Sequence, residues 1–191
     1  MLKDLVQKNR SYRGFNENYT FTKEELEEYI DLARICPSGA NLQGLKYHLV
    51  YEKEAVEELL PFTHFAAQLP ELGLPRKGSH PTAYIVICQD MNITDNPNRL
   101  QKDIGIVAQT MLLYAAENNL GGLMIGNFEL GNVKKVCKLP DNLSPVLLIA
   151  LGKPTEKIVL VDVDESGNTN YYRDENDVHY VPKRKLSDVI V

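Results

Sequence analysis

The segment from residue 101 to 119 constrains the fold of this chain more than any other part of its sequence. Apolar side chains recur there at helical spacing and surround most of the helix instead of forming one stripe: Ile104, Val107, Ala108, Met111, Leu112, Tyr114 and Ala115. A helix that is apolar on most of its circumference is expected to lie inside a core. Gly121 and Gly122 follow it and are predicted to end it in a left-handed conformation.

Two apolar runs of strand length lie before and after this helix in the sequence. Residues 82–88 and 146–151 are predicted to be strands that are buried on both faces. Shorter strands are predicted at 46–52 and 123–125. Residues 158–163 and 169–172 flank the turn-forming sequence at 165–168, which predicts a hairpin.

The other predicted elements are helices. Thr22 and Glu25 have the spacing of a capping box, which predicts a helix over 23–35 that must stop at Pro37. Shorter helices are predicted at 2–10, 53–60 and 131–137. The proline- and glycine-rich segment 61–81 is predicted to be mostly irregular. Strands interleaved with helices, without repeats or linkers, favour a single α/β or α+β domain with a central sheet.

Composition excludes several classes of protein. The chain has 191 residues, of which 43% are apolar, but no apolar run approaches the roughly 20 residues that span a membrane. Its net charge of -5 argues against sequence-independent binding of nucleic acids. The three cysteines show no CxxC spacing and the histidines no zinc-ligand spacing, so no metal site is expected. The amino terminus lacks the features of a secretory signal, and we expect a cytoplasmic protein.

Two polar segments are candidates for ligand binding. Arg10, Ser11 and Arg13 place two guanidinium groups around a hydroxyl, an arrangement that suits a phosphate. The alternative for this segment is a solvated pair of surface charges. The loop 37–43 presents Ser38, Asn41 and Gln43, whose donors and acceptors suit the edge of a planar heterocycle. The alternative here is an ordinary connection whose polar groups satisfy the backbone.

Two further segments are weaker candidates. The glycines of 120–127 would let the backbone approach a flat ligand, although a glycine pair after a helix is also a common helix end. The basic residues 183–185 are a second candidate phosphate site, or a solvated tail.

Taken together and in order, these segments resemble the FMN-dependent nitroreductase family. The resemblance extends over nearly the whole chain and rests on six motifs: R-S-x-R at 10–13, P-S-G-x-N-x-Q at 37–43, D-x-G-x-x-x-Q-x-x-L-x-x-A-A at 103–116 (with Asp103, Gly105, Gln109, Leu112, Ala115 and Ala116), L-G-G at 120–122, G-K-P at 152–154 and P-K-R at 182–184.

The resemblance implies an α+β fold, a three-layer sandwich around a central mixed, mainly antiparallel sheet, in an intertwined homodimer with FMN at the subunit interface. It implies one nitroreductase-like domain over 1–191, with 155–191 as a carboxy-terminal extension that reaches the partner and 101–119 as the dimer core. The residues expected to bind FMN are Arg10, Ser11, Arg13, Pro37, Ser38, Asn41, Gln43, Gly126, Asn127, Lys183 and Arg184.

The implied activity is that of an NAD(P)H-dependent flavin oxidoreductase. It would reduce a small aromatic, nitro or quinone-type acceptor by a ping-pong mechanism, and no catalytic side chain is expected because the flavin carries the chemistry. Two alternatives remain open: an FMN-binding sensor or storage module without NAD(P)H turnover, and a small-molecule or anion-binding domain without flavin.

Overall fold

The computed structural model describes residues 1–66 and 72–191, which form two compact units, Met1–Pro154 and Thr155–Val191. The irregular segment predicted at 61–81 begins within the short 3-10 turn Leu60–Phe62, and its residues 67–71 lie outside the described part. In the described part, none of the helices has the length and apolar character needed to cross a membrane.

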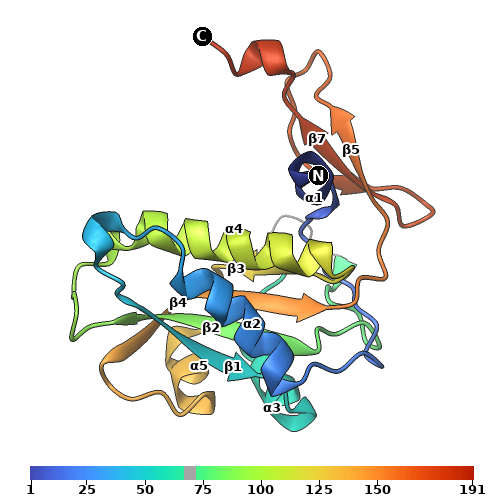
Figure 1. The fold of residues 1–191 in the computed structure, drawn as a ribbon. Coiled ribbons are helices and arrows are strands. Elements are labelled where there is room, and N and C mark those ends of the chain that lie inside the picture. Colours follow the sequence, from blue (N-terminus) through green and yellow to red (C-terminus); the bar gives the residue numbers. More distant parts are fainter. Residues whose placement is uncertain (67–71) are drawn as a thin grey trace. The chain divides into compact units, whose positions relative to one another are not determined.

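The first unit is built on a four-stranded sheet with the strand order β1-β2-β4-β3 (Figure 1). Its strands are β1 Leu45–Val50, β2 Ala83–Asp90, β3 Gly121–Ile125 and β4 Leu143–Gly152. All three ladders are antiparallel, which confirms the mainly antiparallel sheet. A parallel contact is made at the edge strand β3, where Ser11 forms an isolated parallel bridge with Gly122.

Helices pack against both faces of this sheet (Figure 1). Alternate residues of β2 point to opposite sides, so that Tyr84 and Val86 belong to one core cluster while Ile85 and Ile87 belong to the other. The helices α3 Lys53–Leu59 and α5 Leu130–Val136 pack on the Tyr84 side. The helices α2 Lys23–Arg34 and α4 Gln101–Glu117 pack on the Ile85 side. Burial of all eight β2 residues confirms the prediction for 82–88.

Helix α4 differs from its prediction in two ways. One side of it is buried against the sheet through residues such as Val107 and Met111, but Ile106 on the other side is 39% exposed. Within a single chain the helix therefore covers the core instead of lying inside it. The left-handed residue after the helix is Asn119, with φ 57°, and Gly121 and Gly122 already belong to β3. An asparagine can end a helix in this way because it tolerates the left-handed region.

Local signals placed the first two helices correctly. The capping box is formed, since Thr22 Oγ1 accepts from the amide of Glu25 at 3.1 Å and Glu25 Oε2 accepts from the amide of Thr22 at 2.8 Å. Helix α2 accordingly begins at Lys23. The helix predicted at 2–10 is α1, Leu2–Lys8.

The second unit contains a small sheet with the strand order β5-β7-β6. Its strands are β5 Ile158–Asp162, β6 Tyr172–Arg173 and β7 His179–Lys183. The predicted hairpin is wrong: β5 pairs in parallel with β7, and β6 pairs antiparallel with β7. The turn exists, since Gly167 N donates to Asp164 O, but the chain after it does not return along β5 because the longer strand β7 occupies that position.

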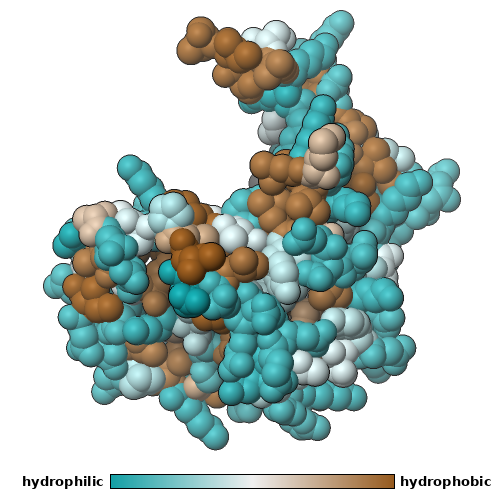
Figure 2. Space-filling view, viewed as in Figure 1, coloured by the Kyte–Doolittle hydropathy of each residue, from teal (hydrophilic) through white to brown (hydrophobic). Residues whose placement is uncertain are grey.

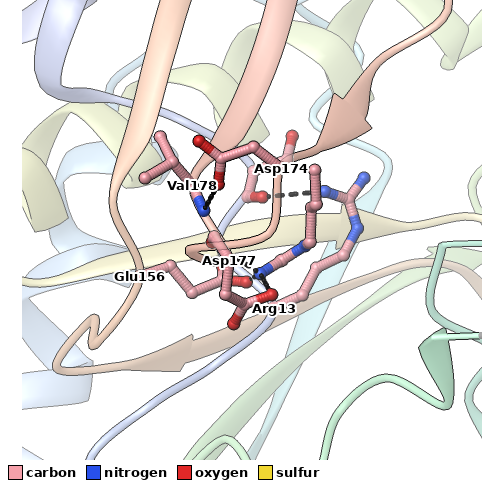
Figure 3. Close-up of polar contacts among 7 residues, drawn as sticks. Arg13, Glu156, Asp174, Asp177 and Val178 are labelled. Carbon is pink, nitrogen blue, oxygen red and sulfur yellow. Dashed lines mark hydrogen bonds and ion pairs between the residues drawn. The ribbon is translucent and has the colours of Figure 1, made fainter.

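A buried ion pair helps to hold this second unit together. Arg173 contacts Glu156, and the two side chains are 5% and 7% exposed. Arg173 also donates to Asp177 Oδ1 at 3.0 Å, while Asp174 Oδ1 accepts from the amide of Val178 at 2.9 Å (Figure 3). The unit thus depends on polar contacts as well as on its short strands.

Candidate functional site

The segment 10–13 lies along the beginning of β3. Ser11 forms a parallel bridge with Gly122, and the amide of Tyr12 donates to the carbonyl of Gly122 at 3.1 Å. A Cβ atom at Gly121 would overlap the ring of Tyr12, and one at Gly122 would lie 2.2 Å from the carbonyl oxygen of Ala150. The two glycines are therefore required for close packing of the chain on itself.

Arg10 is a half-buried cation without a carboxylate partner. Its Nη2 atom donates to the carbonyl of Val6 at 2.5 Å, whereas its Nε atom is buried without a hydrogen-bond partner. No ion pair in the described part of the chain includes Arg10, and burial lowers the pKa of its guanidinium. Three residues further along, the Nη1 atom of Arg13 donates to the carbonyl of Ser11 at 3.1 Å (Figure 3). A partly desolvated guanidinium of this kind favours an anion.

The loop 37–43 is held against the first turn of α4 by Asp103, whose side chain is buried. Ser38 Oγ donates to Asp103 Oδ2 at 2.6 Å, and the amide of Gly39 donates to Asp103 Oδ1 at 3.0 Å. The amide of Gln43 donates in turn to Ser38 Oγ at 3.0 Å. The hydroxyl of Ser38 has thereby used its one donor and one of its two acceptor positions.

Three residues of this loop have left-handed backbone conformations, namely Ala40 with φ 51°, Asn41 with φ 51° and Gln43 with φ 52°. The side-chain amide of Asn41 is exposed and makes no hydrogen bond with another described residue.

Behind the loop lies a cavity of about 200 Å³ that is bordered by Pro37, Ser38, Gln43, Tyr47 and Asp103 among others. Burial, reinforced by Cys36 and Asp103, raises the pKa of Tyr47 to about 12.

These two groups of residues lie at opposite ends of α4. The loop 37–43 contacts Asp103 in the first turn, and the segment 10–13 contacts Gly122, which follows the last turn. At 1.5 Å per residue, the helix axis from Asp103 to Glu117 is about 21 Å long. Figure 1 shows α1 beside the carboxy-terminal end of α4 and the segment after α2 at the other end. The structure therefore brings each group together but keeps the two groups apart within one chain.

The remaining predicted residues lie elsewhere. Gly126 follows β3, and nothing lies within 4 Å of the position that its Cβ would take. Its neighbour Asn127 accepts a backbone hydrogen bond from His64 at 3.0 Å. Lys183 ends β7 and Arg184 follows it, both exposed, in the second unit. Their proposed contact with a phosphate stays a prediction.

The part played by Asp103 was missed by reasoning from the sequence, although the residue is part of the motif at 103–116. The position of Asp103 in the sequence was the signal that could have revealed this role. An acidic residue at a buried position in the first turn of an otherwise apolar helix must find partners, because an isolated buried carboxylate is costly.

Comparisons of the sequence and of the structure with known proteins lead to one family. The model of the nitroreductase family matches residues 6–153. The oxygen-insensitive NADPH nitroreductase of Helicobacter acinonychis is 28% identical over 96 residues, a match that covers 50% of this chain and 42% of that protein. The Bacillus subtilis protein YodC, which carries the name of an NAD(P)H nitroreductase, is 24% identical, with 78% of this chain and 88% of YodC covered.

A solved structure shows the same fold. A nitroreductase-type protein from Exiguobacterium sibiricum, crystallised in complex with FMN, superposes with a TM-score of 0.65 at 19% identity. The match covers 82% of this chain and 89% of that one. An α+β fold with an antiparallel sheet and packed helices is thus common to both.

Proposed function

This chain belongs to the nitroreductase family of oxidoreductases, and we propose that it binds FMN and uses NADH or NADPH to reduce a small aromatic, nitro or quinone-type acceptor. FMN is the cofactor of this family, and it supplies the electron-transfer chemistry when it is bound. The proposal includes a ping-pong order, in which NAD(P)H and the acceptor use the same pocket in succession.

The residues of this chain fit such a cofactor. The observation that carries the proposal is Arg10, a half-buried guanidinium whose Nε atom lacks a hydrogen-bond partner. Arg10, Ser11 and Arg13 would hold the phosphate and the pyrimidine edge, with Lys183 and Arg184 as further cations. The open space at Gly126 leaves room for a flat ring next to the backbone of Asn127.

The loop 37–43 would contact the flavin ring. Asn41 offers an exposed amide without a described partner, and Gln43 lies two residues further on. Because an amide both donates and accepts, it matches the alternating carbonyls and nitrogens of a flavin edge. Pro37 fixes the backbone where the loop begins.

We further propose that the site is completed by a second copy of the chain. The loop 37–43 and the segment 10–13 contact opposite ends of α4, whose axis from Asp103 to Glu117 is about 21 Å long. One flavin would meet both if two helices α4 pack across a two-fold axis. Figure 2 shows apolar surface over α4, where Ile106 is 39% exposed. The helices on both faces of the sheet support the three-layer sandwich that the family resemblance implies.

The second unit would extend toward the partner. It has only the residues 155–191, and a segment of fewer than about 40 residues seldom builds a sufficient core alone. Its last residues are apolar and exposed, with Leu186, Val189 and Ile190 at 73%, 59% and 66%. Burial of these side chains against another subunit would remove that apolar surface from water. Three free cysteines are compatible with the cytoplasmic location that we propose.

Subunit complementation tests the shared site. One variant carries Arg10→Ala and Arg13→Ala, the other Asn41→Ala and Gln43→Ala, and each is expected to bind FMN weakly as a homodimer. When the two variants are unfolded and refolded together, they form mixed dimers with two sites each. About one site of the two then takes an intact segment 10–13 from one chain and an intact loop 37–43 from the other. Recovered FMN binding supports the proposal. A mixture that binds no better than the separate variants contradicts a site shared between subunits.

The role of the arginines can be measured directly. Replacement of Arg10 and Arg13 by alanine is expected to weaken FMN binding by about 1.5–3 kcal/mol for each charge-assisted hydrogen bond lost. The control is Lys23→Ala, since Lys23 is an exposed cation that pairs with Glu27 on α2. A wild-type protein that takes up no FMN would overturn the proposed function. Bound FMN without steady-state oxidation of NAD(P)H would favour the sensor or storage module instead.

A further inference from the structure

We propose that Asp103 is a positioning residue that fixes the loop 37–43 for contact with the flavin. This inference rests on the proposed function, because it assumes that the loop is part of the cofactor site. It goes further by assigning a role to a residue that was not among the candidates for binding. Its basis is a set of hydrogen bonds that joins one carboxylate to both ends of the loop.

Asp103 acts on the beginning of the loop directly. Its two oxygens accept from the hydroxyl of Ser38 and from the amide of Gly39, at 2.6 Å and 3.0 Å. The side chain comes from the first turn of α4, which is anchored in the core by Val107 and Met111. The loop is thereby tied to a helix that is anchored in the core of the first unit.

Asp103 acts on the end of the loop through Ser38. The hydroxyl of Ser38 donates to Asp103 and accepts from the amide of Gln43 at 3.0 Å. Because the carboxylate orients this hydroxyl, the position of the Gln43 backbone depends on the position of Asp103. Ser38 therefore has no donor left for a ligand, and we assign it mainly to this relay.

The conformation between these two ends needs such support. Ala40, Asn41 and Gln43 all have φ near +51°, a region that side-chain-bearing residues adopt at an energetic cost. Such backbone persists where the surroundings determine it, and here the hydrogen bonds to Asp103 provide that constraint. Without them the loop is expected to relax, and the amide of Asn41 would lose its defined orientation.

The experiment compares three variants of the full-length protein with the wild type. Asp103→Ala removes both acceptors, whereas Asp103→Asn keeps one acceptor for Gly39 and can donate to Ser38. Thr22→Ala is the control for a general loss of stability, because it weakens α2 without touching the loop. Hydrogen exchange at Gly39 and Gln43 is measured without FMN, and FMN affinity and the visible circular dichroism of bound FMN are measured by titration.

We expect Asp103→Ala to accelerate exchange at both amides, to weaken FMN binding by about tenfold or more and to change the dichroism of the bound flavin. Asp103→Asn should lie between Asp103→Ala and the wild type, while Thr22→Ala should bind FMN as the wild type does. Unchanged exchange in Asp103→Ala would show that Asp103 does not hold the loop. Faster exchange with wild-type FMN affinity and dichroism would show that the loop does not position the flavin. Both results overturn the inference alone, whereas a wild type without FMN binding overturns the proposed function as well.

Discussion

The ring of Tyr12 packs on the backbone of Gly121 so closely that a Cβ atom there would lie 2.5 Å from its Cδ2 atom. This contact fixes the segment 10–13 against β3, with Ser11 bridged to Gly122 on the same strand. The position of the two candidate phosphate-binding arginines therefore depends on a residue with no side chain.

Gly121→Ala is expected to destabilise the protein by about 1–3 kcal/mol, because an added methyl group must displace the ring of Tyr12 or the strand. The control is Gly131→Ala, since nothing lies within 4 Å of a Cβ at that position and alanine favours the helix α5. Urea denaturation provides the free energies of unfolding. Equal stability of Gly121→Ala and the wild type would contradict the tight packing.

Thr22→Ala should cost about 1 kcal/mol of stability, because the amide of Glu25 loses its capping acceptor. Thr22→Ser keeps a hydroxyl at the same position and should restore most of the loss. The comparison is again made from urea denaturation curves. A serine variant as unstable as the alanine variant would show that the methyl group of Thr22, and not the cap, supplies the stability.

Arg173→Leu should destabilise the folded second unit. The substitution breaks the buried ion pair between Arg173 and Glu156, and breaking such a pair typically costs about 3–5 kcal/mol. Limited proteolysis should then cut within 155–191 faster than in the wild type, and the double variant with Glu156→Leu should recover part of the resistance. Arg34→Leu is the control, because its pair with Asp31 is exposed and should contribute little. Resistance unchanged in Arg173→Leu would contradict a structural role for the pair.

The buried thiol of Cys88 should make the protein less stable in alkali. Burial raises the pKa of Cys88 to about 12 from an ordinary value of 9.0. Because the folded-state pKa is the higher one, the stabilisation is fully present below pH 9.0 and is lost as the pH rises toward 12. The free energy of unfolding, measured between pH 8 and pH 11, should fall less steeply in Cys88→Ala than in the wild type. Identical slopes would contradict the raised pKa.

Much of the fold could be predicted from local sequence. The capping box at Thr22 and Glu25 placed α2, and the continuous apolar run at 82–88 placed β2 in the centre of the sheet. Predictions failed where pairing between distant segments decides the structure. The turn at 165–168 forms, yet β5 pairs with β7, because the partner of a strand depends on the whole unit and not on its nearest turn. In the same way, Asn119 ended α4 while the glycines after it served packing.

The sequence by itself determined which residue types this chain has for a phosphorylated planar cofactor and in which order they occur, since charge, hydrogen-bonding capacity and glycine content are local properties. Only the tertiary structure decided which of them meet. It joined Ser38 to Asp103 across 65 residues, and it laid Tyr12 on Gly121. It also kept Asn41 and Arg10 at opposite ends of one helix. Such distances follow from how helices and strands pack as rigid bodies, which no single segment of the chain specifies.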